Sequence, residues 1–501
     1  MLTREDIDQI RDRGSDPHTV EKQLERFEKG FPYARLKAPA SVGNGISVFN
    51  DSEKKEIAAY FDTSKGAYSI CRFVPASGAA TRMFKDLFAL RSALEGKSVE
   101  EQQSFLVSDA TAKQFFNDLD RYPFYADLPA EEQTSPLDVL DLLLTQKGLD
   151  YGMLPKGMLK FHRHKGQTRT AFEEHLHEAA HIMLPGKTVK VHFTVSEEHL
   201  DGFKSLEREI VPKLREQYGV RFVVAYSFQK KETDTIAVDM NNAPFRDEQG
   251  TLVFRPGGHG ALLQNLGDID SDVLLINNID NVSPERNSAN RVMHKKVLAG
   301  TLLQAREKVF GLLDQLENAL SEEVADAAAR WLKEVAFAVF PDDFSLKSLQ
   351  ERAAWLREML DRPVRVCGMV RNEGEPGGGP FYVEDTQGNT ALQIVESSQV
   401  DPDDVTQQEL FRKSSHFNPV DIACSTMDRH GNKYSLSEFT DEETGFISKK
   451  SVRGTELKAL ELPGLWNGSM ARWITLFVEI PGSTFTPVKT IFDLLREEHR
   501  E

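Results

Sequence analysis

The sequence predicts an α/β protein with a largely parallel sheet that helices cover on both faces. Apolar strand-like runs alternate with helical patterns from about residue 168 onward, which is typical of βαβ units. An earlier strand–turn–helix pattern at Ser69–Lys85 fits the same architecture. In such sheets ligands bind beyond the carboxyl ends of the strands, so the loops at those ends are the first candidates for a site.

The segment Ser69–Lys85 combines an apolar strand, a turn of small residues and an expected helix start at Thr81. Small residues let backbone N–H groups and a helix N-terminus approach an anion closely, and Arg82 adds a positive charge. The alternative is an ordinary strand-to-helix turn that needs small residues only for space. The phosphate-binding interpretation involves Ala76, Ser77, Gly78, Ala79, Ala80 and Thr81.

Composition narrows the class of protein. The 501 residues carry a net charge of −17, which argues against a general nucleic-acid or anionic-membrane binder. The charged N-terminus does not resemble a signal peptide, and no apolar run approaches the roughly 20 residues of a membrane span. Cys71, Cys367 and Cys424 lie far apart and match no metal spacing. We therefore expect a cytoplasmic protein.

Three later segments contain candidate ligand-binding residues. Lys156, in a Pro–Lys–Gly turn, is a candidate phosphate clamp if the fold brings it near the first turn. The glycine-rich segment 256–260 would allow backbone contact with a planar base or ribose. Asp280, at the end of an apolar strand, suits Mg²⁺, which prefers one or two carboxylates plus substrate phosphates. The alternative for Lys156 is a surface turn, and that for the glycine-rich segment is a plain turn. For Asp280 the alternative is an Asx turn or a helix cap.

A competing pattern occurs on a predicted helix near Thr170–Leu184. His177, Glu178 and His181 match H-E-x-x-H, in which two histidines on one helical face hold Zn²⁺ and the glutamate acts as base. The sequence lacks the extended pattern with a third histidine. The alternative is a solvated helix face.

Taken in order along residues 68–425, the motifs resemble those of sugar nucleotidyltransferases, and most closely those of UDP-sugar pyrophosphorylases. The chain also resembles a narrower bacterial family described as nucleotidyltransferase-like, whose marks include Leu457–Trp473 and Phe477–Arg496. The segments that carry the first resemblance are VPASGAATRM (Val74–Met83), LPKGMLKF (Leu154–Phe161), SFQKKE (Ser227–Glu232), RPGGHGALL (Arg255–Leu263), LLINNIDNV (Leu274–Val282) and, more weakly, HFNPVD (His416–Asp421).

The resemblance implies a Rossmann-like, three-layer α/β/α nucleotidyltransferase fold of the GT-A type with a mixed, mostly parallel sheet. It also implies four segments: a helical lead-in (1–65), a nucleotide-binding α/β half (66–283), a helical insertion (284–361), and a sugar-phosphate-binding half with the C-terminal elements (362–501). The implied reaction joins a sugar 1-phosphate to a nucleoside triphosphate, UTP if Gln229 reads uracil, with Mg²⁺ and release of pyrophosphate.

The resemblance also implies roles for individual residues. Arg82, Lys156 and Lys458 would neutralise phosphate charge, and Asp280 would bind the metal. Gln229, Gly258, His259 and Gly260 would hold the base and ribose, and Asn281, Asn418 and Asp421 would face the sugar or the metal.

The sequence departs from the family's glycine signature. Ser77 and Ala80 stand near positions where the signature has glycine, and each added Cβ narrows the space for a phosphate. This leaves open a catalytically altered nucleotide-binding or sugar-nucleotide-binding protein as the alternative to an enzyme.

Overall fold

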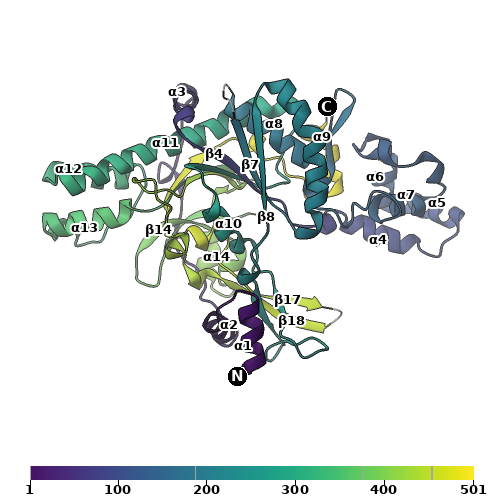
Figure 1. The fold of residues 1–501 in the computed structure, drawn as a ribbon, viewed down its shortest axis with the longest axis horizontal. Coiled ribbons are helices and arrows are strands. Elements are labelled where there is room, and N and C mark those ends of the chain that lie inside the picture. The colour runs from purple at the N-terminus through teal and green to yellow at the C-terminus, as the bar shows by residue number, and fades with distance from the viewer. Residues whose placement is uncertain (1, 185, 187, 376, 453–454, 501) are drawn as a thin grey trace. The chain divides into compact units, whose positions relative to one another are not determined.

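The computed structural model describes residues 2–184, 186, 188–375, 377–452 and 455–500 (Figure 1). The chain divides into two compact units, each assembled from three separate stretches. The first unit comprises Met1–Ser69, Gln229–Leu275 and Val297–Pro481, and the second comprises Ile70–Phe228, Ile276–Lys296 and Gly482–Glu501.

The second unit contains three parallel strands in the order β4 (Ile70–Pro75), β7 (Thr188–Thr194) and β8 (Arg221–Ser227). Helix α8 (Ala171–Met183) lies along β7, and α9 (Leu200–Tyr218) lies along β8 (Figure 1). The alternation of strands and helices predicted from the sequence is therefore confirmed.

The same unit contains a helical group, α4–α7, built on an aromatic and aliphatic core (Figure 1). Val488, Ile491 and Leu494 belong to this core, so the last stretch of the chain is anchored in the second unit. The remaining elements of the unit are α4 (Lys85–Leu94), α5 (Val99–Ser108), α6 (Ala110–Asn117), α7 (Pro136–Leu144), β5 (Lys160–His164) and β6 (Gln167–Thr170).

The first unit contains a run of strands in the order β2–β3–β19–β12–β16. The pairs β2–β3, β3–β19 and β19–β12 are parallel, and β12–β16 is antiparallel. Two smaller antiparallel sheets, β10–β9–β18–β17 and β1–β13–β14, complete the unit. The strands are β1 (Arg35–Pro39), β2 (Ser41–Val42), β3 (Gly45–Ser47), β9 (Thr235–Val238), β10 (Phe254–Arg255), β12 (Val364–Arg371), β13 (Gly379–Glu384), β14 (Thr390–Val395), β15 (His416–Phe417), β16 (Asp421–Ser425), β17 (Phe446–Val452), β18 (Thr455–Glu461) and β19 (Ile474–Glu479).

Two elements cross from one unit to the other along the chain, β11 (Val273–Asn277) and α11 (Ser288–Asn318). The prediction that residues 284–361 are mostly helical is confirmed by α11, α12 (Glu322–Glu334) and α13 (Leu349–Leu360). The helices of the first unit are α1 (Arg4–Asp12), α2 (Pro17–Lys29), α3 (Asp51–Ser64), α10 (Leu262–Asp268), α12 (Glu322–Glu334), α13 (Leu349–Leu360) and α14 (Val405–Arg412).

The fold is thus mixed α/β with a mostly parallel central sheet, as predicted. Among the described residues, no helix combines the length and apolar character needed to cross a membrane.

Two predicted helices differ from the structure. The helix expected from Thr81 begins only at Lys85, after a 3₁₀ turn at Ala80–Arg82. The reason is a tertiary contact: the Ala80 N–H donates to the carbonyl of Leu154, which holds this stretch extended along another segment. The sequence after Pro487 also predicts a final helix, whereas the structure forms short 3₁₀ turns there, at Ile491–Leu495 and Glu497–His499.

Candidate functional site

The loop that follows β4 lies along the segment 152–155. Its Ala80 N–H donates to the Leu154 carbonyl at 2.9 Å, and Ala79 forms an isolated β-bridge with Pro155. A Cβ added to Gly78 would meet no protein atom within 4 Å, so the space beside this residue is open. Gly78, Ala79, Thr81 and Arg82 are exposed, Ser77 is half-buried, and Ala76 and Ala80 are buried.

This geometry changes the anion-binding argument. Because α4 starts at Lys85, its N-terminus does not directly follow the small residues, and its dipole does not contribute as expected. Exposed backbone and the exposed Arg82 remain as the groups that an anion would meet.

Lys156 opens the 3₁₀ turn Lys156–Met158 directly after Pro155. A Cβ on Gly157 would lie 2.8 Å from the Phe203 ring and 3.3 Å from the Ile279 side chain, so the turn is pressed tightly into its surroundings. The Lys156 ammonium donates to Asp280 Oδ2 at 2.8 Å and to the Val488 carbonyl at 2.7 Å. The structure therefore joins Lys156 to Asp280, two residues that the sequence singled out separately.

Asp280 follows β11 and is buried, with 6% of its surface exposed. The ammonium of Lys489 also donates to its Oδ2, at 2.9 Å. Burial alone would raise the pKa of Asp280, but Lys156 and Lys489 outweigh that effect and lower it below its usual value. Asp280 is therefore an anion held between two cations.

The other oxygen of this carboxylate bears on the expected metal. Asp280 Oδ1 is buried and has no hydrogen-bond partner among the described residues. A single carboxylate oxygen fits Mg²⁺, which takes most of its ligands from water and phosphates. In the described part of the chain, no three His, Cys, Asp or Glu side chains gather as a metal cage, so a metal here would depend on the substrate.

The motifs described above did not single out Lys489. It lies in the segment Phe477–Arg496, which the sequence marked as characteristic without assigning it a role. The only available signal was its position two residues after Pro487, because the contact with Asp280 spans 209 residues.

The remaining predicted residue of the second unit, Asn281, is buried. Its Oδ1 accepts from the Thr486 N–H at 3.0 Å and from Arg291 at 3.2 Å. These contacts tie Asn281 to the stretch that carries Lys489.

The glycine turn at 257–260 lies in the first unit and is packed against protein. A Cβ on Gly257 would lie 2.6 Å from the Thr233 carbonyl oxygen, and one on Gly260 would lie 2.0 Å from that of Pro463. Gly258 has a φ of +76°, which favours glycine. Internal contacts thus account for these three glycines without a ligand.

His259 stacks on Trp466 with ring centroids 4.3 Å apart, and its Nδ1 accepts from the Leu465 N–H. Burial lowers the pKa of His259 to about 4, so the ring is neutral near pH 7.

Gln229 and Lys458 also lie in the first unit. The Gln229 amide donates to Asp234 Oδ1 at 3.2 Å. The Lys458 ammonium, on β18, contacts Asn242 Oδ1 and the Met240 carbonyl. Lys458 therefore belongs to a different compact unit from the Lys156–Asp280 pair.

Asn418 and Asp421 flank a strained residue. Val420 has a φ of +60°, which is rare for a β-branched residue, and its N–H donates to Asn418 Oδ1 at 3.1 Å. Asn418 also donates to the Gly368 carbonyl, and Asp421 begins β16. Both side chains are buried in the first unit.

The H-E-x-x-H residues do not form the arrangement of a zinc peptidase. His177 and His181 both lie within hydrogen-bonding distance of the Tyr218 hydroxyl, at 2.7 and 3.2 Å. Glu178 is buried among Arg72, Arg291 and Lys295, so it is not free to act as a base. The expected solvated helix face is also wrong, because His177 and Glu178 are buried.

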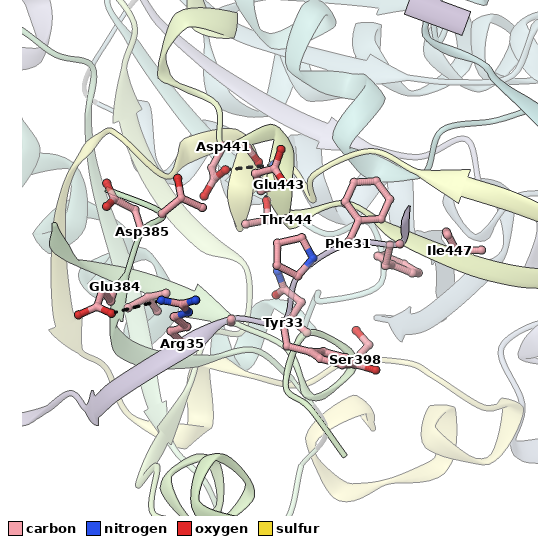
Figure 2. A pocket seen from close by; sticks show the side chains of 18 residues that line it. Phe31, Tyr33, Arg35, Glu384, Asp385, Ser398, Asp441, Glu443, Thr444 and Ile447 are labelled. Atoms are coloured by element: carbon pink, nitrogen blue, oxygen red, sulfur yellow. Dashed lines mark hydrogen bonds and ion pairs between the residues drawn. The ribbon is translucent and has the colours of Figure 1, made fainter. Parts of the chain in front are cut away.

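A cavity of about 420 Å³ lies in the first unit (Figure 2). Its labelled lining includes Phe31, Tyr33 and several acidic side chains, and Arg35 points toward Glu384, its ion-pair partner at 3.8 Å. No residue of the predicted site is among the described residues that line it.

No curated protein matches the sequence. Among solved structures, the chain is similar to UDP-glucose pyrophosphorylase from Leishmania major, with 13% identity, a TM-score of 0.47, and coverage of 99% of this chain and 79% of that chain. It is also similar to uridine diphosphate N-acetylglucosamine pyrophosphorylase from Trypanosoma brucei, with 13% identity, a TM-score of 0.48, and coverage of 95% and 74%. Residues 3–500 match the family described as "Domain of unknown function (DUF4301)", and the chain belongs to that family.

Proposed function

We propose that this chain is a nucleotidyltransferase that joins a sugar 1-phosphate to a nucleoside triphosphate, UTP in the first instance, and releases pyrophosphate. The observation that carries the proposal is the meeting of Lys156 and Lys489 on Asp280, next to the open loop that follows β4. The ordered motifs along residues 68–425 support the same class of reaction.

The proposed reaction mainly requires that the phosphates are positioned and that their negative charge is neutralised. A phosphate oxygen of the sugar phosphate attacks the α-phosphorus of the nucleotide, and the bond from that phosphorus to the pyrophosphate oxygen breaks. The attacking oxygen is already anionic, so no strong general base is needed. Two ammonium groups at fixed positions, together with Arg82 on the loop after β4, would neutralise charge on the phosphates.

Each carboxylate oxygen of Asp280 has its own role in the proposed reaction. Its Oδ2 fixes both ammonium groups, which limits the reorganisation needed when a polyphosphate binds. Its Oδ1 is the atom that would hold Mg²⁺, and the ion would supply further charge neutralisation on the phosphates.

The other site residues stay predictions. Gln229, Gly258, His259 and Gly260 keep the implied contacts to base and ribose, and Asn418 and Asp421 keep the implied contacts to the sugar. A cytoplasmic location is part of the proposal, and it agrees with three unpaired, buried cysteines.

The test is pyrophosphate release from the purified full chain, with Mg²⁺ and a panel of nucleoside triphosphates and sugar 1-phosphates. Lys156→Ala and Asp280→Ala should abolish release. Lys213→Ala is the matched control, because this lysine lies in the same unit with a largely exposed side chain.

Three results are informative. Release that depends on Lys156 and Asp280 supports the proposal. Nucleotide binding by calorimetry without turnover would instead identify a binding protein on the same fold. No release from any pair, together with no nucleotide binding, would overturn the proposal.

A further inference from the structure

Glu178 is a buried carboxylate surrounded by three cations. Its Oε1 lies 2.7 Å from Arg72 Nη1 and 3.4 Å from Lys295 Nζ, and its Oε2 lies 3.0 Å from Arg291 Nε. Burial alone would raise the pKa of Glu178, but the cations outweigh burial and hold it well below its usual value. The residue is therefore ionised and fixed, and the proposed reaction does not use it.

Arg291 extends from this carboxylate to a different part of the unit. Its side chain is 1% exposed. Nη1 donates to the Thr484 carbonyl at 2.6 Å and to Asn281 Oδ1 and Thr486 Oγ1 at 3.2 Å each. Nη2 donates to the Asn281 carbonyl at 2.8 Å. A planar guanidinium serves these acceptors in one fixed orientation, which a lysine ammonium cannot do.

The residues that Arg291 binds adjoin the proposed phosphate contacts. Asn281 follows Asp280 directly and forms an isolated β-bridge with Pro487. The Thr486 N–H donates to Asn281 Oδ1, and the Val488 N–H donates to the Asp280 carbonyl at 2.9 Å. Thus the stretch 484–488 is fastened along 280–281, and it ends where Lys489 meets Asp280.

These contacts offset the conformational entropy that the stretch 484–488 loses when it is ordered. The stretch 484–488 lies in no α-helix or strand, so it must be ordered by contacts with other segments. The contacts of Arg291 are buried and charge-assisted, which makes them stronger than hydrogen bonds between neutral groups. Glu178 in turn fixes the orientation of the guanidinium through Nε.

We propose that Arg291, oriented by Glu178, is a positioning residue that holds the stretch 484–488 in register so that Lys489 is presented to Asp280. This inference rests on the proposed function for the role of Lys489, but its structural core can be tested without turnover.

The main test is amide hydrogen exchange of the full chain in Arg291→Lys. This variant keeps the positive charge beside Glu178 and loses the fork that binds Asn281 and Thr484. The amides of Thr486 and Val488 should exchange at least about tenfold faster than in the wild type. Arg72→Lys is the matched control, because it alters a second cation of Glu178, and the Arg72 side chain donates to Glu178 rather than to Asn281 or Thr486. It should leave both amides unchanged.

A second readout is the binding of inorganic pyrophosphate by calorimetry. Arg291→Lys and Lys489→Ala should each weaken it, and the double variant should bind no more weakly than Lys489→Ala alone, because both changes remove the same contact. Additive losses would show that Arg291 acts independently of Lys489.

The outcomes separate the two proposals. Unchanged exchange at Thr486 and Val488 in Arg291→Lys would overturn the positioning role, and so would equal acceleration in Arg72→Lys. Faster exchange in Arg291→Lys alone, in a protein that binds neither pyrophosphate nor nucleotide, would uphold the fastening of the stretch while the proposed function fails.

Discussion

Lys156 and Asp280 are separated by 124 residues, yet the ammonium of one donates to the carboxylate of the other at 2.8 Å. Lys489 reaches the same carboxylate oxygen at 2.9 Å. Two cations and one anion leave a net positive charge beside the open loop after β4. A polyphosphate chain has the complementary charge, and this is the physical basis of the proposed function.

Asp280→Asn should lower the rate of pyrophosphate release by at least about 100-fold. The amide keeps the shape of the side chain but removes the charge that fixes both ammonium groups, and it weakens any Mg²⁺ contact. Release is measured across a Mg²⁺ titration. Asp201→Asn, an exposed change in the same unit, serves as control and should leave the rate unchanged. Wild-type rates in Asp280→Asn would remove this carboxylate from the mechanism.

Lys489→Ala should reduce release by about 100-fold, whereas Lys458→Ala should change it by less than about threefold. The sequence motifs favoured Lys458 as a second phosphate contact, but its ammonium contacts Asn242 and Met240 in the first unit. Steady-state kinetics of the two variants side by side decide between them. A larger loss in Lys458→Ala would restore the prediction from sequence.

Gly78 borders open space, whereas Gly157 is tightly packed, so an added methyl group should affect stability differently at the two positions. Gly78→Ala adds a methyl group to open space, so the melting temperature should stay within about 1 °C. If a phosphate approaches this backbone closely, the same methyl group should weaken UTP binding about tenfold. Calorimetry with UTP measures this, and unaltered affinity would mean that the loop does not hold the phosphates.

Gly157→Ala is the counterpart. The new Cβ would lie 2.8 Å from the Phe203 ring, so overpacking should cost about 1–3 kcal/mol of stability. Thermal unfolding measures the loss. A fully stable variant would show that the turn carrying Lys156 is less tightly held than these distances indicate.

The sequence pattern was enough to predict helices and strands that are determined by residues close together in the chain. The strand Ile70–Pro75, the strand Thr188–Thr194 and the Thr170 N-cap of α8 all follow from apolar runs and short-range capping chemistry. The sequence singled out Lys156 and Asp280 separately, as a phosphate clamp and a metal ligand, and did not predict that the two side chains form an ion pair.

Long-range contacts explain what the pattern did not reveal. The helix start at Thr81 failed because Ala80 is bonded to Leu154 rather than to its own chain neighbours. Glu178 looked like a solvated or catalytic residue, since its partner Arg72 is 106 residues away. Each compact unit combines three stretches of chain. The sequence pattern along the chain does not show which of these stretches fold together.

Glu178→Gln should lower the free energy of unfolding by about 3–5 kcal/mol, because it leaves three buried cations without their anion. Urea unfolding measures the change. His181→Gln, a half-buried change on the same helix, is the control and should cost much less. Stoichiometric zinc in purified wild-type protein, lost in His181→Gln, would instead revive the metallopeptidase interpretation.

The buried Glu174 predicts that the stability of the folded protein falls as the pH rises. It is buried beside His162, with Oε1 and the His162 Nδ1 2.9 Å apart. Burial raises the pKa of Glu174 to about 7 from its usual 4.5. A raised carboxyl pKa adds stability that is fully present below pH 4.5 and is lost as the pH rises through 7, because the unfolded chain ionises first.

The comparison with Glu174→Gln isolates this group. Between pH 6 and pH 8 the stability of the wild type should fall relative to Glu174→Gln by about 1 kcal/mol, or about 2 °C in melting temperature. Burial lowers the pKa values of His162 and His499 to about 3, so both rings are neutral in the folded protein between pH 6 and pH 8 and their contributions cancel in the difference. A difference in melting temperature that stays constant from pH 6 to pH 8 would mean that Glu174 is already ionised in the folded protein, with Arg169 as the nearest cation to compensate its charge.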